Sequence, residues 1–133
     1  MRLNQDAFRP GETLRMTLHL RNPGPILTVD HYVGVIFPDG QTVLWLTNTS
    51  PIEGVVTTLD SNPNTFVPML RHISWPAGLD ATQQDYLTHT FTGLESLGVY
   101  HLLVAWTEPR SLEDGRIDAG DIIALDWKAI HVQ

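Results

Sequence analysis

The chain has 133 residues, of which 42% are hydrophobic and 17% are charged, and this size and balance are typical of one folded domain. Its net charge of −7, from 15 acidic and 8 basic residues, argues against a nucleic-acid-binding surface and against contact with an anionic membrane. The absence of cysteine excludes a disulfide framework, a thiol nucleophile and a zinc–thiolate site. No stretch of about 18 apolar residues is present, so we expect no membrane insertion.

The first regular element is predicted over residues Thr13–Asn22. Hydrophobic side chains occupy every second position of this segment: Leu14, Met16, Leu18 and Leu20. Strict alternation with polar side chains predicts a strand that has one buried face and one solvent-facing face. Pro-Gly pairs on both sides mark its ends.

A hairpin is predicted next. His31–Phe37 is rich in Val and Ile, Pro38–Gly40 forms a tight turn, and Gln41–Thr47 returns with apolar side chains. Residues 48–64 then show little pattern. We expect a long loop there, with at most one short strand near Val55 and Val56.

The centre of the chain is less regular. Residues 66–75 are largely apolar and are expected to cross the end of the core. Asp80 is an acceptable N-cap for one short helical turn.

Three later segments again alternate with period two: residues 85–92, 97–106 and 122–132. The first half of the last segment is apolar on both parities. It is therefore expected to be a central strand or to contain a bulge.

About seven strands without intervening helices favour an all-β fold, and an internal repeat is absent. We therefore predict one domain, residues 1–133, folded as an immunoglobulin-like antiparallel β-sandwich of about seven to nine strands. The chain begins with polar residues after Met1 and not with an apolar leader, so we expect an excised domain of a larger protein.

A set of short motifs recurs in a characteristic order: Phe8–Leu14, Asn22–Gly24, Pro38–Gly40, Gly98–Tyr100 and Trp106. This order resembles bacterial immunoglobulin-like and fibronectin-III-like modules of secreted and surface proteins. The resemblance implies a β-sandwich at the cell surface or outside the cell. It also implies neighbouring domains of a larger exported protein, or other surface proteins, as partners.

The chain departs from that group in two ways, because residues 48–81 form a longer middle segment than usual and no cysteine pair bridges the sheets. Tyr100 stands at a strand entry. There its hydroxyl can bond to upstream backbone as a tyrosine corner does, or can face a ligand.

The most distinctive chemical feature is the acidic stretch Glu113–Asp121. With Gly115 at the sixth position of a calcium loop, Asp114, Asp118 and Asp121 take positions that carry ligands, and Glu113 lies beside them. The first half of the loop departs from the pattern, because Arg110 stands where the first carboxylate belongs. The stretch is thus either a solvated turn or a non-standard calcium site, and calcium is the one cofactor considered.

Four tryptophans could stack on sugar rings or fill the core. Trp106 and Trp127 lie in strand patterns and are predicted to be core residues. Trp75, beside Pro76 in an irregular segment, is predicted to be exposed and is the candidate for ligand stacking, with a glycan as the partner. Four histidines are predicted to be exposed or half-exposed: His19, His31, His101 and His131.

Catalytic motifs are absent, including a nucleophile elbow, a phosphate loop and a dinucleotide fingerprint. We therefore expect a non-catalytic structural or adhesive module of a larger exported bacterial protein. Two alternatives remain open, namely an accessory domain that binds carbohydrate or calcium, and an extracellular subunit that self-assembles through its edge strands.

Overall fold

The computed structural model describes residues 1–60 and 62–133; Ser61, in the segment predicted to be a loop, lies outside them. Within these residues the chain forms ten strands and one short 3₁₀ helix. Their bounds are β1 Arg2–Leu3, β2 Ala7–Phe8, β3 Thr13–Asn22, β4 Leu27–Ile36, β5 Thr42–Thr49, β6 Ile52–Thr58, β7 Leu70–Trp75, β8 Leu79–Thr90, β9 Gly98–Thr107, η1 Ala119–Asp121 and β10 Ile122–Val132. The described part of the chain contains no helix long and apolar enough to cross a membrane.

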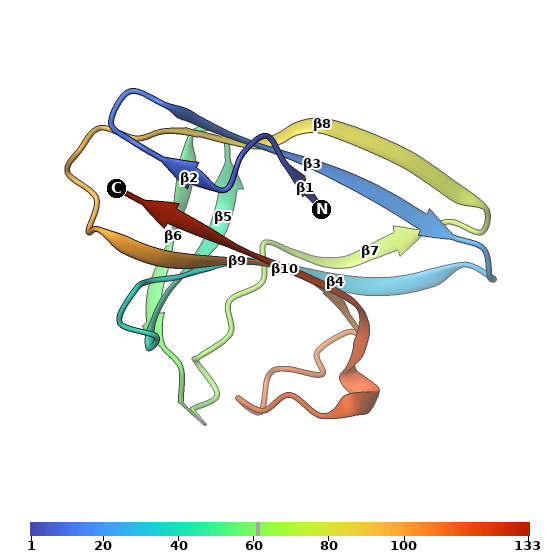
Figure 1. Ribbon diagram of the computed structural model, residues 1–133. Helices are drawn as coiled ribbons and strands as arrows, with labels where there is room; N and C mark the ends of the chain where they lie inside the picture. The colour runs from blue at the N-terminus through green and yellow to red at the C-terminus, as the bar shows by residue number, and fades with distance from the viewer. Residues whose placement is uncertain (61) are drawn as a thin grey trace.

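The strands form two facing sheets (Figure 1). The small sheet has the order β1-β3-β8. The large sheet has the order β2-β10-β9-β4-β5-β6, and β7 also pairs with β4. The pairing of β2 with β10 is parallel, and the other pairings are antiparallel. The predicted all-β fold of two packed sheets is confirmed.

Hydrophobic side chains pack on both faces of the large sheet. The main core lies between the two sheets and includes Met16, Val33 and Leu46. On the opposite face, a second cluster centred on Tyr32 and Trp45 is covered by side chains from two loops, residues 62–69 and 108–118. Figure 1 shows these loops below the large sheet, on the side away from the small sheet.

Several predicted elements have the bounds expected from their alternation. The strand over residues 13–22 is β3, and the last strand is β10 with its register shift between Ile122 and Ala124, as the apolar pattern on both parities indicated. The predicted hairpin is formed by β4 and β5, but β4 begins at Leu27 and not at His31. Three strands were not predicted. β1 and β2 have only two residues each, too few to show a period, and β7 lies in the segment that was expected only to cross the end of the core.

The short helical turn predicted at Asp80 is wrong. Asp80 lies in β8, opposite Arg21 of β3, and its Oδ1 is 3.0 Å from the Nε2 atom of His19. The segment that follows Asp80 is polar and exposed, so it carries no alternation that marks a strand in sequence. Pairing with β3 decides its conformation, because cross-strand contacts outweigh local propensity.

Candidate functional site

The acidic stretch lies in the loop between β9 and β10. The Oδ1 atom of Asp114 accepts a hydrogen bond of 2.9 Å from the backbone N–H of Arg116. The Oδ2 atom of Asp121 accepts one of 2.9 Å from the N–H of Asp118, at the start of η1. These carboxylates therefore serve local turns. In the described parts of the chain, no three His, Asp or Glu side chains are grouped as a metal site would require.

Glycine is required at position 115 for a reason that does not involve calcium. Its φ is +77°, a conformation that favours glycine. A Cβ atom at this position would lie 2.2 Å from the carbonyl oxygen of Asn62. The glycine therefore allows this loop to pack directly against the loop that follows β6.

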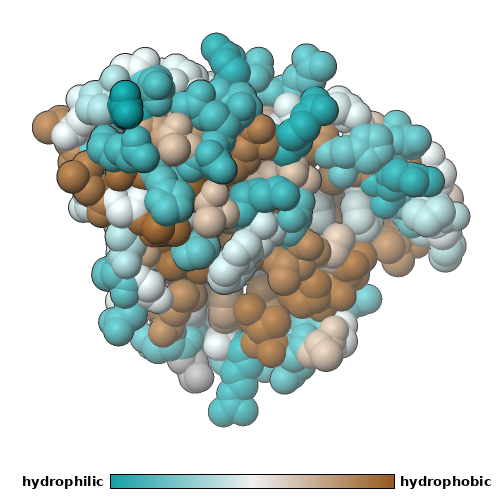
Figure 2. Space-filling view, in the orientation of Figure 1, coloured by the Kyte–Doolittle hydropathy of each residue, from teal (hydrophilic) through white to brown (hydrophobic). Residues whose placement is uncertain are grey.

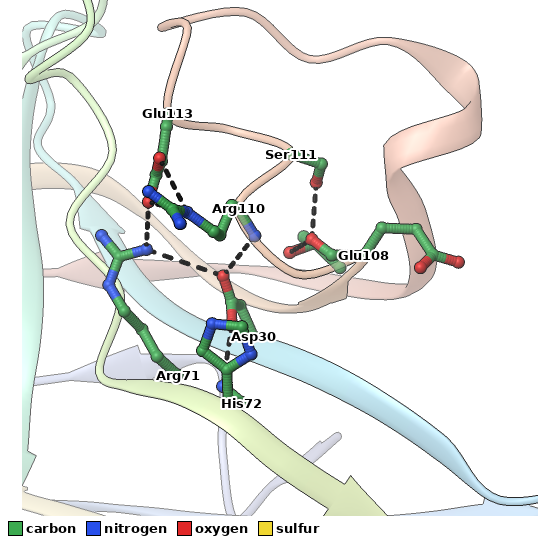
Figure 3. Close-up of polar contacts among 8 residues, drawn as sticks. Asp30, Arg71, His72, Glu108, Arg110, Ser111 and Glu113 are labelled. Atoms are coloured by element: carbon green, nitrogen blue, oxygen red, sulfur yellow. Dashed lines mark hydrogen bonds and ion pairs between the residues drawn. The ribbon is translucent and has the colours of Figure 1, made fainter.

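Glu113, the first residue of the acidic stretch, joins two arginines (Figure 3). Its Oε1 atom is 2.8 Å from Nη1 of Arg71, and its Oε2 atom is 3.3 Å from Nε of Arg110. The same Nη1 atom of Arg71 is 3.7 Å from Oδ2 of Asp30, on β4. The acidic stretch is thus linked to the large sheet through Glu113.

Asp30 is fully buried and is the centre of this network. Its Oδ1 atom accepts a hydrogen bond of 3.0 Å from the N–H of His72, and its Oδ2 atom accepts one of 2.8 Å from the N–H of Arg110. Both donors are non-glycine residues with positive φ, 51° for His72 and 63° for Arg110. Such conformations are held only where the surroundings fix them.

We call this group the Asp30 clamp, and it consists of Asp30, Arg71, His72, Arg110 and Glu113 (Figure 3). The clamp joins β4, β7 and the β9–β10 loop. Sequence reasoning missed it, because the partners come from distant residues and two of them are backbone groups. The one signal was a lone carboxylate within an apolar run.

His31, next to Asp30, points into the main core. Its ring stacks on Trp106 with centroids 3.7 Å apart, and its Nδ1 atom lies 3.1 Å from the carbonyl oxygen of Ala105. Because a carbonyl can only accept, Nδ1 donates, and Nε2 accepts from the Tyr86 hydroxyl at 2.6 Å. Burial lowers the pKa of His31 to about 4, although the bond to Ala105 acts in the opposite direction.

The prediction that His31 is exposed or half-exposed is therefore wrong. Its position in β4 points to the same face as Val29 and Val33, and the two ring nitrogens find partners there. A neutral imidazole with both nitrogens bonded can be buried at modest cost.

Of the three predictions for tryptophan burial, one is confirmed and two are wrong. Trp106 is buried as predicted, but Trp75 is only 7% exposed and stacks on Trp106 at 5.4 Å, so its predicted exposure is wrong. β7 pairs with β4, and this pairing turns Trp75 inward at the end of the core. Trp127 is 53% exposed, so its core assignment is wrong as well: it lies opposite Leu103 of β9, on the face of the large sheet that points away from the main core.

A cleft opens between the two sheets at the end opposite Trp75 and Trp106. Its volume is about 880 Å³, within the usual size of ligand sites. Its roof is formed by β3, β8 and the loop after β8, and its floor by strands of the large sheet. The hydrophobic lining is Leu14, Val35, Phe37, Leu44, Ile52, Leu87, Phe91, Leu94, Tyr100, Leu102 and Ile130. Two smaller recesses lie near Met1. One, of about 190 Å³, is lined by side chains that include Leu18, Trp75 and Trp106, and the other lies beside exposed side chains of β3 and β8.

The charged groups at the rim of the cleft are paired with each other or with nearby backbone. Arg15 lies 3.4 Å from Asp85, and His89 lies 3.1 Å from Glu95. Partial burial raises the pKa of Glu95, but hydrogen bonds from the backbone of Thr92 and from the His89 ring prevail and lower it to about 2. Glu95 is thus a fixed carboxylate that holds the turn after β8.

Tyr100 lies near the start of β9 and forms part of the cleft floor. Its hydroxyl donates a hydrogen bond of 2.8 Å to the carbonyl oxygen of Ser96. The predicted bond to upstream backbone is confirmed. It holds the loop of residues 92–97, whose Leu94 is 92% exposed at the mouth of the cleft.

No family model matches the chain, and no curated protein matches it at a significant level. One solved structure is similar in shape, that of Spo0M, sporulation control protein, from Bacillus subtilis. The sequence identity is 15% and the TM-score 0.46, over 98% of this chain and 46% of that chain. The chain thus spans less than half of that protein. Similarity at this level carries no argument about function, and the resemblance to bacterial immunoglobulin-like modules stays a prediction.

Proposed function

We propose that the protein is a non-catalytic binding module whose cleft holds an uncharged apolar group of a partner molecule. The observation that carries this proposal is the cleft itself, about 880 Å³ in volume and lined by eleven hydrophobic side chains. Polar side chains, among them Ser50, Thr88 and Ser96, complete the lining. A large, mainly apolar cleft that also offers some polar groups is the default ligand site in a protein whose function is open.

The burial of the lining gives a driving force for occupancy. Val35, Phe37, Leu44 and Ile52 point to the cleft and are only partly buried, although they lie in or next to the central strands of the large sheet. An occupant that covers them removes apolar area from water, worth roughly 25 cal/mol per Å². The site is therefore suited to hydrophobic binding.

The rim supports an uncharged occupant. Arg15 is paired with Asp85, and Glu95 accepts from His89 and from the turn that it holds. A charged ligand would have to compete with these internal contacts after losing its own water. A neutral aliphatic or aromatic group meets no such penalty.

Glu95 at the rim of the cleft is suited to holding the turn and not to proton transfer. A carboxylate whose pKa is about 2 is a poor general acid or base near neutral pH, so Glu95 is unsuited to proton transfer. Its oxygens are also occupied by hydrogen bonds from the Thr92 and Gly93 backbone.

The wider setting in this proposal is a structural or adhesive module of a larger exported protein, and it rests on the motif resemblance alone. Calcium binding by Asp114, Asp118 and Asp121 is not part of the proposal, because at least Asp114 and Asp121 already accept hydrogen bonds from loop backbone.

The test uses the purified chain and the neutral apolar dye N-phenyl-1-naphthylamine, whose fluorescence rises in apolar surroundings. We expect one saturable site per chain. Leu44→Trp fills the cleft from its floor and should weaken dye binding by about tenfold or more, equivalent to about 1.4 kcal/mol.

The matched control is Leu125→Trp, which makes the same replacement at an exposed position outside the cleft. It should leave dye binding unchanged. Binding that does not saturate, or that is equal in the two variants with unchanged melting temperatures, would count against the proposal.

A further inference from the structure

The large sheet ends at β6, and among the residues that the structure describes this strand pairs with β5 alone. An edge strand carries a row of backbone N–H and C=O groups that can pair with another chain. β6 has seven residues and is largely exposed on both faces, with Val56 at 62%. It is therefore long enough to form a ladder with a further strand.

The other edges are shorter or carry charges. β1 and β2 have two residues each. β8, the edge of the small sheet, carries Asp80 and Asp85, which form ion pairs with His19 and Arg15. Figure 2 shows hydrophilic side chains over the upper part of this view, where the small sheet lies. β7 carries Arg71, an ion-pair partner in the Asp30 clamp.

β6 has none of these protections along most of its length. Residues 54–58 read Gly-Val-Val-Thr-Thr, an uncharged run that contains no proline and is rich in β-branched side chains. Natural edge strands usually carry Lys, Pro or inward-pointing charges that prevent pairing between molecules. An edge that lacks them is suited to association.

We propose that β6 pairs with β6 of a second copy of this chain in an antiparallel arrangement, so that two large sheets join into one. Pairing centred on Val55 brings Glu53 opposite Thr57 of the other copy, and pairing centred on Val56 brings it opposite Leu59. A parallel in-register pairing would bring the two Glu53 carboxylates together, and like charges directly opposite are destabilising.

The antiparallel arrangement is two-fold symmetric. Each copy contributes the same β6 edge, and this edge is fully paired in the dimer. No further copy can then bind to it, so association ends at the dimer. Of β6, only Ile52 at its start is among the residues that line the cleft; Val55 and Val56, on which the pairing is centred, are not. The dimer and the dye site are measured separately, so the failure of one proposal leaves the other intact.

Ionic strength provides a signature of this contact. Each copy has a net charge of −7, so two copies repel one another at long range, while the paired edges themselves carry no charge along residues 54–58. Salt screens the repulsion and leaves the backbone pairing in place. Dimerisation is therefore expected to strengthen as salt is raised, the opposite of an interface held by ion pairs.

The test is sedimentation equilibrium of the full chain across a range of protein and salt concentrations. We expect a monomer–dimer equilibrium that shifts toward the dimer with salt. Val56→Lys should raise the dissociation constant more than about tenfold, because it places a lysine on the pairing edge. Gln84→Lys adds the same charge to the exposed β8 strand and should not weaken the dimer.

Thr58→Lys, at the exposed end of the same strand, repeats the test if Val56→Lys fails to fold, as circular dichroism will show. A wild-type chain that stays monomeric at the highest concentration and salt overturns the proposal. So does a dimer that Gln84→Lys weakens as much as Val56→Lys, and so does assembly that continues beyond two copies.

Discussion

The two ends of the main core are built from similar strands but differ in how they are filled. At the packed end, the rings of His31, Trp75 and Trp106 stack on one another between the sheets. At the open end, the side chains of Phe37 and Leu44 line a cleft of about 880 Å³. Interiors of folded proteins are ordinarily close-packed, so a gap of this size in one half of a core is a feature to explain.

The difference suggests that the two ends of the core have different roles, one in stability and the other in binding. The packed end carries the Asp30 clamp, which fixes β7 and the β9–β10 loop against the large sheet, and the buried His31, which bonds the Tyr86 hydroxyl of the small sheet. We expect these contacts to stabilise the fold enough for the open end to leave apolar side chains partly exposed. Binding sites are commonly placed on the less stable parts of a fold.

The largest expected effect is the loss of the Asp30 clamp. Asp30→Ala leaves the backbone N–H groups of His72 and Arg110 without their acceptor and removes the charge that faces Arg71. We expect the free energy of unfolding to fall by about 4 kcal/mol. Urea unfolding followed by circular dichroism measures it.

The control for this prediction is Asp114→Ala, in the same loop cluster, where the carboxylate accepts a single exposed hydrogen bond. It should cost less than about 1 kcal/mol. Equal effects of the two variants would mean that Asp30 is only one of several exchangeable contacts and that the packed end has no special centre.

The second prediction concerns pH and the buried imidazole at the packed end. The pKa of His31 is 6.5 in the unfolded chain and about 4 in the folded chain, so between these values the unfolded state binds more protons. The free energy of unfolding should therefore fall as pH drops through this window, by up to about 3 kcal/mol. Above pH 6.5 this contribution is constant.

His31→Gln removes this titration. Its unfolding free energy should be lower at neutral pH but should depend less on pH between 6.5 and 4, and urea unfolding at several pH values compares the two chains. Parallel pH profiles would show that His31 titrates normally and is solvated in the folded protein.

A matched pair of leucines on β5 tests the comparison most directly. Leu44 and Leu46 face the same side of the large sheet, but Leu46 is fully buried while Leu44 lines the cleft. Leu46→Ala should cost about 3 kcal/mol, because it leaves a new cavity. Leu44→Ala should cost about 1 kcal/mol, because the space beside it is already open.

Both values come from urea unfolding, with the denaturant slope as a check that the compactness of the unfolded state is unchanged. Similar losses for the two variants would mean that the open end closes in solution, and the contrast between the ends would then disappear.

Sequence periodicity was sufficient for the fold class and for strands such as β3 and β10, because alternation follows directly from having one buried face. It failed for the start of β8, where Asp80 and the polar residues that follow carry no period and pairing with β3 decides. It also could not place His31 or Trp75, since their burial depends on partners from β7, β8 and β9.

The candidate sites were harder to predict for a physical reason. In the Asp30 clamp, two of the hydrogen-bond donors are the backbone N–H groups of residues 72 and 110. Every residue except proline has such a group, so the residue type does not reveal the donor. The cleft is lined by residues of both sheets and of the loop after β8, so no single segment of the sequence encodes it. Tyr100 was predictable because its partner, the carbonyl of Ser96, lies only four residues upstream.

The smallest expected effect is at this tyrosine, and it addresses the open end alone. Tyr100→Phe removes the hydrogen bond to Ser96 and keeps the ring in the cleft floor, so the free energy of unfolding should fall by only about 1 kcal/mol. The local effect should be larger than the global one, because this bond holds the loop that carries Leu94. Hydrogen exchange of the amides of residues 94–97 should speed up, while those of β4 at the packed end change little. Faster exchange in both places would mean that the two ends unfold as one unit, and the distinction between a stabilising end and a binding end would lose its basis.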